Sequence, residues 1–180
     1  MAAELRTERL SLRRPEPGDV AAILAIHSDP RTVTHNRSDA LATLAEAEDL
    51  FGRWDDHWER HGFGYWVVRS RDSPPQLGFC GVKVAQLRGR PVLNLFYRFA
   101  PASWGRGVAS EAATAVVRWA EEAEPSRPVI ARVRPDNVAS QRVAVRAGLV
   151  RAEHLDEQGY DGLDWLYRSE ISEVRAPGTR

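Results

Sequence analysis

The chain has 180 residues, 43% of them hydrophobic, which suits one folded domain with a buried core. Lys plus Arg and Asp plus Glu number 25 each, so no net positive charge draws the whole protein to nucleic acid. The single cysteine excludes an internal disulfide or a cysteine zinc site, and no segment resembles a signal peptide or the roughly 20 apolar residues of a membrane span. We therefore expect a cytoplasmic protein without nucleic-acid or membrane partners.

The first predicted elements are a strand and a helix. Leu10 and Leu12 alternate with polar residues, which predicts a short strand that ends before Pro15. Asp19 then stands at the capping position of an apolar helix over 20–26.

A polar loop over 31–36 separates this helix from a longer one. The second helix is expected to begin at Ser38 or Asp39, because both residue types cap helices, and to end at Gly62. The tryptophans of this helix, Trp54 and Trp58, are four residues apart and are expected to pack against the core or, alternatively, to line a binding groove.

Three strands follow, because the spacing of apolar residues changes to strand-like runs and alternation. They are expected over 65–68, 77–87 and 92–99, separated by turns at 73–75 and 88–91.

The C-terminal part is expected to alternate helices and strands. A helix of about fifteen residues follows Pro101, and a second helix over 137–147 ends at Gly148. The loop 159–162 is expected to join the last two strands. The strands are expected over 129–133, 149–154 and 165–171.

The chain shows neither internal repeats nor a linker. It is therefore expected to form a single domain over 1–174 with a frayed tail over 175–180. The fold class is α/β, with a mixed sheet and helices between the strands.

The most informative motif is the glycine-rich segment 103–109. Gly105 and Gly107 let the backbone approach a ligand closely, and the helix that follows has one apolar stripe. Free amides and the positive end of the helix dipole then predict an anion site, to which Arg106 adds a charge. A tight connection without a ligand is the alternative. The segment is neither a P-loop nor a dinucleotide fingerprint, because it lacks the lysine and the third glycine of those motifs.

A second group of polar residues lies at the start of the helix predicted over 137–147. Asn137 and Ser140 are three residues apart and share a helix face, with Ala144 one turn further along. Asp136 or Asn137 could equally serve only as the helix cap.

These segments resemble the GNAT N-acetyltransferases, and in particular the branch that includes the ribosomal-protein-alanine (Rim-type) enzymes. The likeness covers nearly the whole chain and is carried by the strand 94–99, the motif 104–112 with Trp104 at its first position, and the opening 6–13. The resemblance implies a fold that contains both helices and strands, which is α/β in the broad sense and α+β in type. The GNAT fold has a mixed, mostly antiparallel twisted sheet of about six or seven strands, splayed between the strands at 92–99 and 129–134, with about four helices.

The resemblance also implies acetyl-CoA as co-substrate, with no metal. Backbone amides of 105–109 would hold the CoA pyrophosphate, and the strand end at 97–99 would bond the pantetheine arm. Asn137 would bond the pantetheine amides. The implied cofactor-binding residues are Tyr97, Phe99, Trp104, Gly105, Arg106, Gly107, Val108, Ala109, Asn137 and Ser140.

The catalytic residues depart from the family pattern. Relatives often carry a tyrosine at the position of Ala144 and a glutamate at that of Asn94. Ser140 is therefore the candidate general acid, and Asn94 could orient a water or the substrate. His35, Glu111 and Asp161 are conceivable bases that the sequence does not separate. Direct attack by the neutral fraction of the amine is the alternative.

Other residues have simpler interpretations. His57 and His61 have a spacing that can bind zinc, but the residue after His57 is Trp58 rather than the glutamate of metalloproteases. Cys80 lies in an apolar strand and is interpreted as a buried hydrophobic residue. The loops 31–36 and 159–162 are candidate acceptor contacts.

The predicted function is transfer of an acetyl group from acetyl-CoA to a primary amine, of a protein N-terminus or a small molecule, by direct attack in a ternary complex. A non-catalytic acyl-CoA-binding or sensor module is the alternative, and a nucleotide-binding protein is a third. Exposed strand edges are compatible with a homodimer.

Overall fold

The computed structural model describes residues 4–170, which form nine strands and four α-helices. The strands are β1 Leu5–Arg6, β2 Leu10–Arg13, β3 Tyr65–Ser70, β4 Gln76–Leu87, β5 Arg90–Phe99, β6 Val129–Val133, β7 Val150–Arg151, β8 Glu157–Gly159 and β9 Gly162–Arg168. The helices are α1 Val20–His27, α2 Leu44–His61, α3 Val108–Ala123 and α4 Val138–Arg146. The expected domain boundary at 174 and the tail over 175–180 lie outside the described residues.

The strands form one mixed sheet in the order β1-β2-β3-β4-β5-β6-β9-β7, and β8 pairs with β9. Every pairing is antiparallel except that of β5 with β6. This confirms the mixed, mostly antiparallel sheet, although the prediction of six or seven strands was too low. The missed β8 forms a hairpin with β9, so the loop 159–162 is a tight turn between these two strands.

The two parts of the sheet separate between β5 and β6. These strands pair only at Leu93 with Val129 and at Asn94 with Ile130. β5 then continues to Phe99 without a partner on that side, which confirms the predicted splay. Because unpaired strands diverge, an opening forms between β5 and β6 beyond Asn94.

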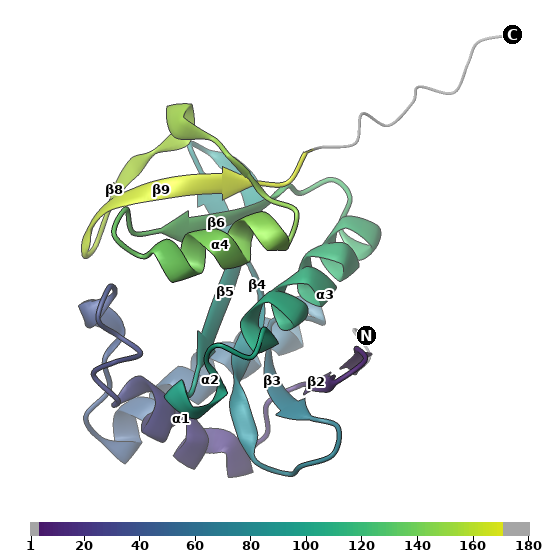
Figure 1. The fold of residues 1–180 in the computed structure, drawn as a ribbon, viewed down its shortest axis with the longest axis vertical. Helices are drawn as coiled ribbons and strands as arrows, with labels where there is room; N and C mark the ends of the chain where they lie inside the picture. The colour runs from purple at the N-terminus through teal and green to yellow at the C-terminus, as the bar shows by residue number, and fades with distance from the viewer. Residues whose placement is uncertain (1–3, 171–180) are drawn as a thin grey trace, which may run out of the picture.

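Helices cover both faces of the central strands. α3 and α4 lie in front of β4, β5 and β6 in Figure 1, where the apolar stripe of α3 packs on alternate residues such as Cys80, Val82 and Leu95. α1 and the first part of α2 pack on the other face, around Val67 and Phe79. Successive strand residues point to opposite faces, so the two faces of β5 can serve different purposes.

Several predicted boundaries were wrong, and β9, for example, begins at Gly162 and not at Trp165. α2 begins at Leu44 and not at Ser38 or Asp39, because Thr43 and Glu46 form a reciprocal capping box there. The segment 149–154 is not one strand, because β7 spans only Val150–Arg151 and a 3₁₀ helix follows it.

Asp19 stands at the N-cap of α1, as predicted, but its side chain makes no capping hydrogen bond. The carboxylate is 1% exposed and accepts from the Arg13 guanidinium and Gln76 instead. Burial alone would raise the pKa of Asp19, but these donors outweigh it and lower the pKa. Asp19 therefore ties β2 to β4.

No helix within residues 4–170 is long and apolar enough to cross a membrane.

Candidate active site

The glycine turn lies between the end of β5 and the start of α3. Gly105 has φ 73° and Gly107 has φ 75°, left-handed conformations that favour glycine. Gly107 is the N-cap of α3 and supplies no side-chain cap. Trp104 is half-exposed, and its indole N–H donates to the carbonyl of Phe99 at 2.9 Å. The tryptophan therefore fixes the turn against the strand end.

The backbone at the start of α3 leaves its first amides without partners in the helix. The amide of Glu111 donates to the carbonyl of Gly107 at 3.0 Å and closes the first turn of α3. The amides before it point away from the helix body, at the positive end of the helix dipole. This is the geometry that the glycine spacing predicts.

Arg9 is a charged neighbour of the turn that the sequence interpretation missed. Its guanidinium donates to the carbonyl of Arg106 at 3.0 Å and pairs with the Glu111 carboxylate. The side chain also lies 3.4 Å from where a Cβ on Gly107 would be. Since Arg9 and Glu111 are 102 positions apart, no local pattern could have revealed the contact.

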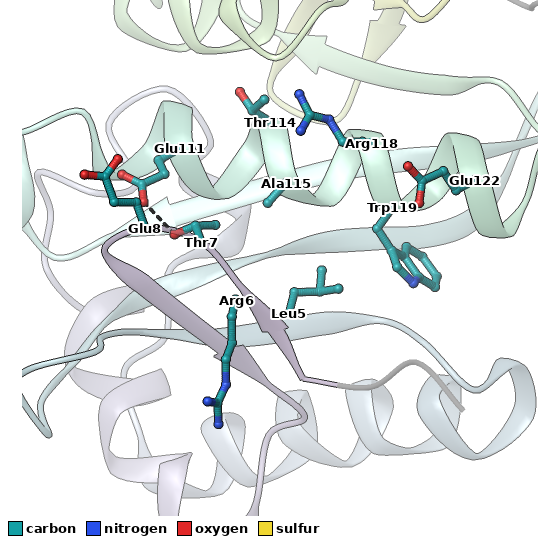
Figure 2. A pocket seen from close by; sticks show the side chains of 10 residues that line it. All are labelled: Leu5, Arg6, Thr7, Glu8, Glu111, Thr114, Ala115, Arg118, Trp119 and Glu122. Atoms are coloured by element: carbon teal, nitrogen blue, oxygen red, sulfur yellow. Dashed lines mark hydrogen bonds between the residues drawn. The ribbon is translucent and has the colours of Figure 1, made fainter.

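Glu111, one of the three conceivable bases, is held by other residues. Thr7 Oγ1 donates to it at 2.5 Å, as Figure 2 shows, and Arg9 donates from both backbone and side chain. Burial pushes the pKa of Glu111 up, but these donors outweigh it and lower the pKa. The carboxylate lines a cavity of about 450 Å³ between β1 and α3 that does not include Asn94.

Tyr97 and Ser140, predicted separately, meet across the opening of the sheet. The Tyr97 hydroxyl donates to the Ser140 carbonyl at 2.8 Å and lies 2.7 Å from Ser140 Oγ. Burial raises the pKa of Tyr97, which keeps its hydroxyl protonated. The contact joins β5 to α4, where Ala144 is fully buried.

Asn137 is the N-cap of α4, so the structural interpretation of this residue is confirmed. Its Oδ1 accepts from the Ser140 amide at 3.0 Å. Only the oxygen of the side chain takes part in this cap, and the Nδ2 amide group stays available for another partner.

A second cavity, of about 440 Å³, lies on the opposite face of β5. Asn94, Phe96 and Arg98 project into its wall from alternate positions of β5. Asn94 Oδ1 accepts from Arg132 of β6 at 2.9 Å, at the point where the two strands separate. Trp54 of α2 is 1% exposed and also lines the cavity, so it serves both packing and the groove.

The two predicted acceptor loops both reach this cavity. Asn36 lines it from the loop 31–36, and Tyr160 and Asp161 line it from the β8–β9 turn. Asp161 accepts from the Ser38 hydroxyl at 2.6 Å, so the β8–β9 turn is hydrogen-bonded to the 3₁₀ helix that follows the loop 31–36. His35, the third conceivable base, lies 3.2 Å from Asp136 and does not line the cavity.

His57 is occupied within the fold. Its Nδ1 lies 2.8 Å from the Phe63 carbonyl, and its Nε2 accepts from the Val84 amide at 3.1 Å. Burial lowers the pKa of His57 to about 4, so the ring is neutral. His57 therefore links α2 to β4. Cys80 is fully buried, as predicted, and burial raises its pKa.

Comparisons with known proteins agree with this geometry. Residues 9–150 match the family model described as "Acetyltransferase (GNAT) domain". The uncharacterized protein YkkB of Bacillus subtilis is 28% identical over 148 residues, which cover 81% of this chain and 84% of that protein.

Solved structures share the whole fold. An acetyltransferase from Agrobacterium tumefaciens aligns with a TM-score of 0.79 and 26% identity, over 94% of this chain and 95% of that one. RimL, a ribosomal alpha-N-protein acetyltransferase in complex with coenzyme A, aligns with a TM-score of 0.78 and 14% identity, over 94% and 98% of the two chains. The Rim-type resemblance is thus confirmed at the level of the fold. The chain belongs to the GNAT family of acetyl-CoA-dependent acetyltransferases.

Proposed function

We propose that the protein transfers the acetyl group of acetyl-CoA to a primary amine, of a small molecule or a protein N-terminus, by direct attack in a ternary complex. The opening between β5 and β6 carries this proposal. The glycine turn, α3 and α4 lie on one face of it, and the 440 Å³ cavity lies on the other. Acetyl-CoA would enter from the first face and the amine from the second. The proposed location is the cytoplasm.

The proposed binding of acetyl-CoA rests on backbone geometry. Amides of 105–109 would bind the pyrophosphate, aided by Arg106 and by Arg9, whose side chain lies against the turn. Beyond Asn94, the edge of β5 that faces β6 has no strand partner. Its backbone groups are therefore available to the pantetheine amides, as is Nδ2 of Asn137.

The chemical step is acyl transfer with no covalent enzyme intermediate. The amine nitrogen attacks the thioester carbon, so a C–N bond forms and the C–S bond breaks. The amine gives one proton to water, and the leaving thiolate takes one from the Ser140 hydroxyl, which regains a proton from water. The Tyr97 hydroxyl, 2.7 Å from Ser140 Oγ, positions the serine. Asn94 orients the attacking group from the opposite face.

Two measurements test the proposal. Acetyl-CoA at 100 times its Kd should stabilise the protein by about 2.7 kcal/mol, whereas ATP and NAD should not. A panel of primary amines should then release free thiol from acetyl-CoA. Stabilisation without thiol release from any amine would support the acyl-CoA-binding sensor instead, and stabilisation by ATP or NAD would contradict both.

A further inference from the structure

The charges of the 440 Å³ cavity are not balanced. Three carboxylates line it, and each has partners within the protein: Arg98 for Asp39, Arg134 for Asp164, and Ser38 for Asp161. Five cationic side chains line the same space: Arg53, Lys83, Arg98, Arg132 and Arg134. Arg132 is paired with Glu157, which lies outside the lining.

Two of the cations have no counterion among the residues that the structure describes. Within the described part of the chain, neither Arg53 nor Lys83 has a carboxylate within 4 Å. Burial, together with the charge of Arg53, lowers the pKa of Lys83 to about 8. The ammonium lies over the ring of Tyr65 at 4.6 Å, which stabilises the charge without neutralising it.

Arg98 has an unused donor. Its side chain is 7% exposed, and Nη2 donates to Asp39 at 2.7 Å. Nη1 is buried without a hydrogen-bond partner among residues 4–170. Buried guanidinium nitrogens are ordinarily hydrogen-bonded, and Arg98 is one of the residues that line the cavity, so its spare donor favours a ligand that brings an acceptor to this residue.

We infer that the acceptor is a small amine that also carries a carboxylate, which Arg53, Lys83 and Arg98 bind. This inference rests on the proposed function of the same site. The volume suits a small molecule, and a carboxylate supplies both the missing negative charge and the acceptor atoms for a guanidinium. A simple ammonium or a polyamine would add positive charge to a cavity that already has an excess.

The same charges also affect how the acceptor amine loses its proton, for which no general base has been identified. Unpaired cations disfavour a protonated amine nearby and so lower its pKa. The ligand carboxylate balances one of the two unpaired charges, and the positive charge that remains lowers the pKa of the amine held beside it. The chain has Asn94 where relatives often carry a glutamate. This fits the scheme, because a carboxylate at that position would stabilise the ammonium form of the amine.

Matched pairs of acceptors test the inference by thiol release. Glycine, alanine and β-alanine are compared with glycinamide, alaninamide and β-alaninamide. The α-amides have the more weakly basic amines, so simple reactivity favours them. We expect kcat/KM to be at least about tenfold higher for the acids, a difference that one charge-assisted contact can supply. Equal use of acids and amides, or a preference for the polyamine spermidine, would overturn the inference and leave the proposed function intact.

Substitutions test whether Arg53 binds the carboxylate of the acceptor. Arg53→Gln, at an exposed position of α2, should raise KM for the acids about tenfold and change KM for the amides by less than about threefold. Arg60→Gln on the same helix does not line the cavity and is the control. An equal loss for acids and amides in Arg53→Gln would contradict carboxylate binding.

A binding measurement stands apart from turnover. In the presence of CoA, N-acetylglycine should raise the melting temperature of the wild-type protein, and N-acetylglycinamide should not. Arg53→Gln should abolish the difference. If no amine releases thiol, the proposed function fails, while this comparison still decides whether the cavity binds a carboxylate. Identical shifts for the two compounds would overturn the inference.

Discussion

At the scale of single residues, the site combines groups whose roles depend on their partners. Ser140 is an ordinary polar residue of a helix start until Tyr97 places a second hydroxyl 2.7 Å away. Lys83 would be a simple surface cation if burial and Arg53 did not lower its pKa to about 8. Sequence motifs predicted Ser140 and Tyr97 as site residues, but their contact and the lowered pKa of Lys83 follow from packing.

Replacing Ser140 with alanine tests the proposed acid. We expect Ser140→Ala to lower kcat about 100-fold, because the thiolate loses its nearest proton donor, with the Kd for CoA changed less than about twofold. Steady-state kinetics and CoA titration measure the two effects. Tyr97→Phe is the matched variant and should show a smaller loss of kcat. Full turnover in Ser140→Ala would rule out the role.

Lys83 should make stability depend on pH. Its folded pKa of about 8 lies below the ordinary value of 10.5, so the unfolded chain binds more protons between these values. The free energy of unfolding should therefore rise from pH 8 to pH 10.5. After allowance for screening of this partly exposed group, the rise relative to Lys83→Met should be about 1–2 kcal/mol. Urea unfolding at several pH values measures it, and parallel curves for the two proteins would contradict the assignment.

At the scale of elements, the residues at which helices begin determine which segments are left to line the proposed site. Thr43 and Glu46 begin α2, and Gly107 begins α3. The capping box of α2 is visible in the sequence as Thr43-Leu44-Ala45-Glu46, yet Ser38 and Asp39 carry equally good capping side chains. These two lie in a 3₁₀ helix instead, where Asp39 pairs with Arg98 and Ser38 with Asp161. Contacts with residues distant in sequence therefore determine which of these capping side chains begins the helix.

Loss of the Thr43 cap should destabilise the protein. Thr43→Ala removes the acceptor of the Glu46 amide and should lower the free energy of unfolding by about 1 kcal/mol. Thr43→Ser keeps the hydroxyl and should be nearly neutral. Urea denaturation compares the two, and equal midpoints would show that the cap does not stabilise α2.

The left-handed conformation of Gly107 should matter for both stability and cofactor binding. Gly107→Ala places a Cβ at φ 75° and should cost about 1–3 kcal/mol, with weaker acetyl-CoA binding as the turn shifts. Gly18→Ala, where the backbone has no positive φ and no atom lies within 4 Å of the new Cβ, is the control. Unfolding curves and acetyl-CoA titration test both. An unchanged affinity in Gly107→Ala would argue against the turn as the pyrophosphate site.

At the scale of the whole molecule, the sheet consists of two parts joined by a short ladder. β1 to β5 form one part and β6 to β9 the other, and only two residue pairs connect β5 with β6. α3 contacts both parts and α4 closes over β6. The proposed acetyl-CoA site uses the opening that this weak joint creates.

Acetyl-CoA should therefore stiffen the joint. We expect hydrogen exchange to slow in residues 95–99 of β5 and in α4, because the pantetheine arm would bond the one and pack beside the other. α1 lies away from the proposed cofactor face and should exchange at the same rate with and without acetyl-CoA. Protection confined to other regions would place the cofactor elsewhere.

The sequence by itself determined the features that depend on neighbouring residues. Periodicity predicted α3 and β6, glycine and capping residues predicted the turn before α3 and the start of α4, and the family motif predicted the splayed sheet. Such signals suffice because backbone conformation is set within a few residues.

The tertiary structure alone decided which distant side chains meet. It brought Arg9 to Glu111, Tyr97 to Ser140, and Arg98 to Asp39. It also decided that Arg53 and Lys83 line one cavity with no counterion among residues 4–170. These outcomes depend on how helices and strands pack across tens to a hundred positions, and no local pattern encodes the balance of charge in a space that forms only when the chain folds.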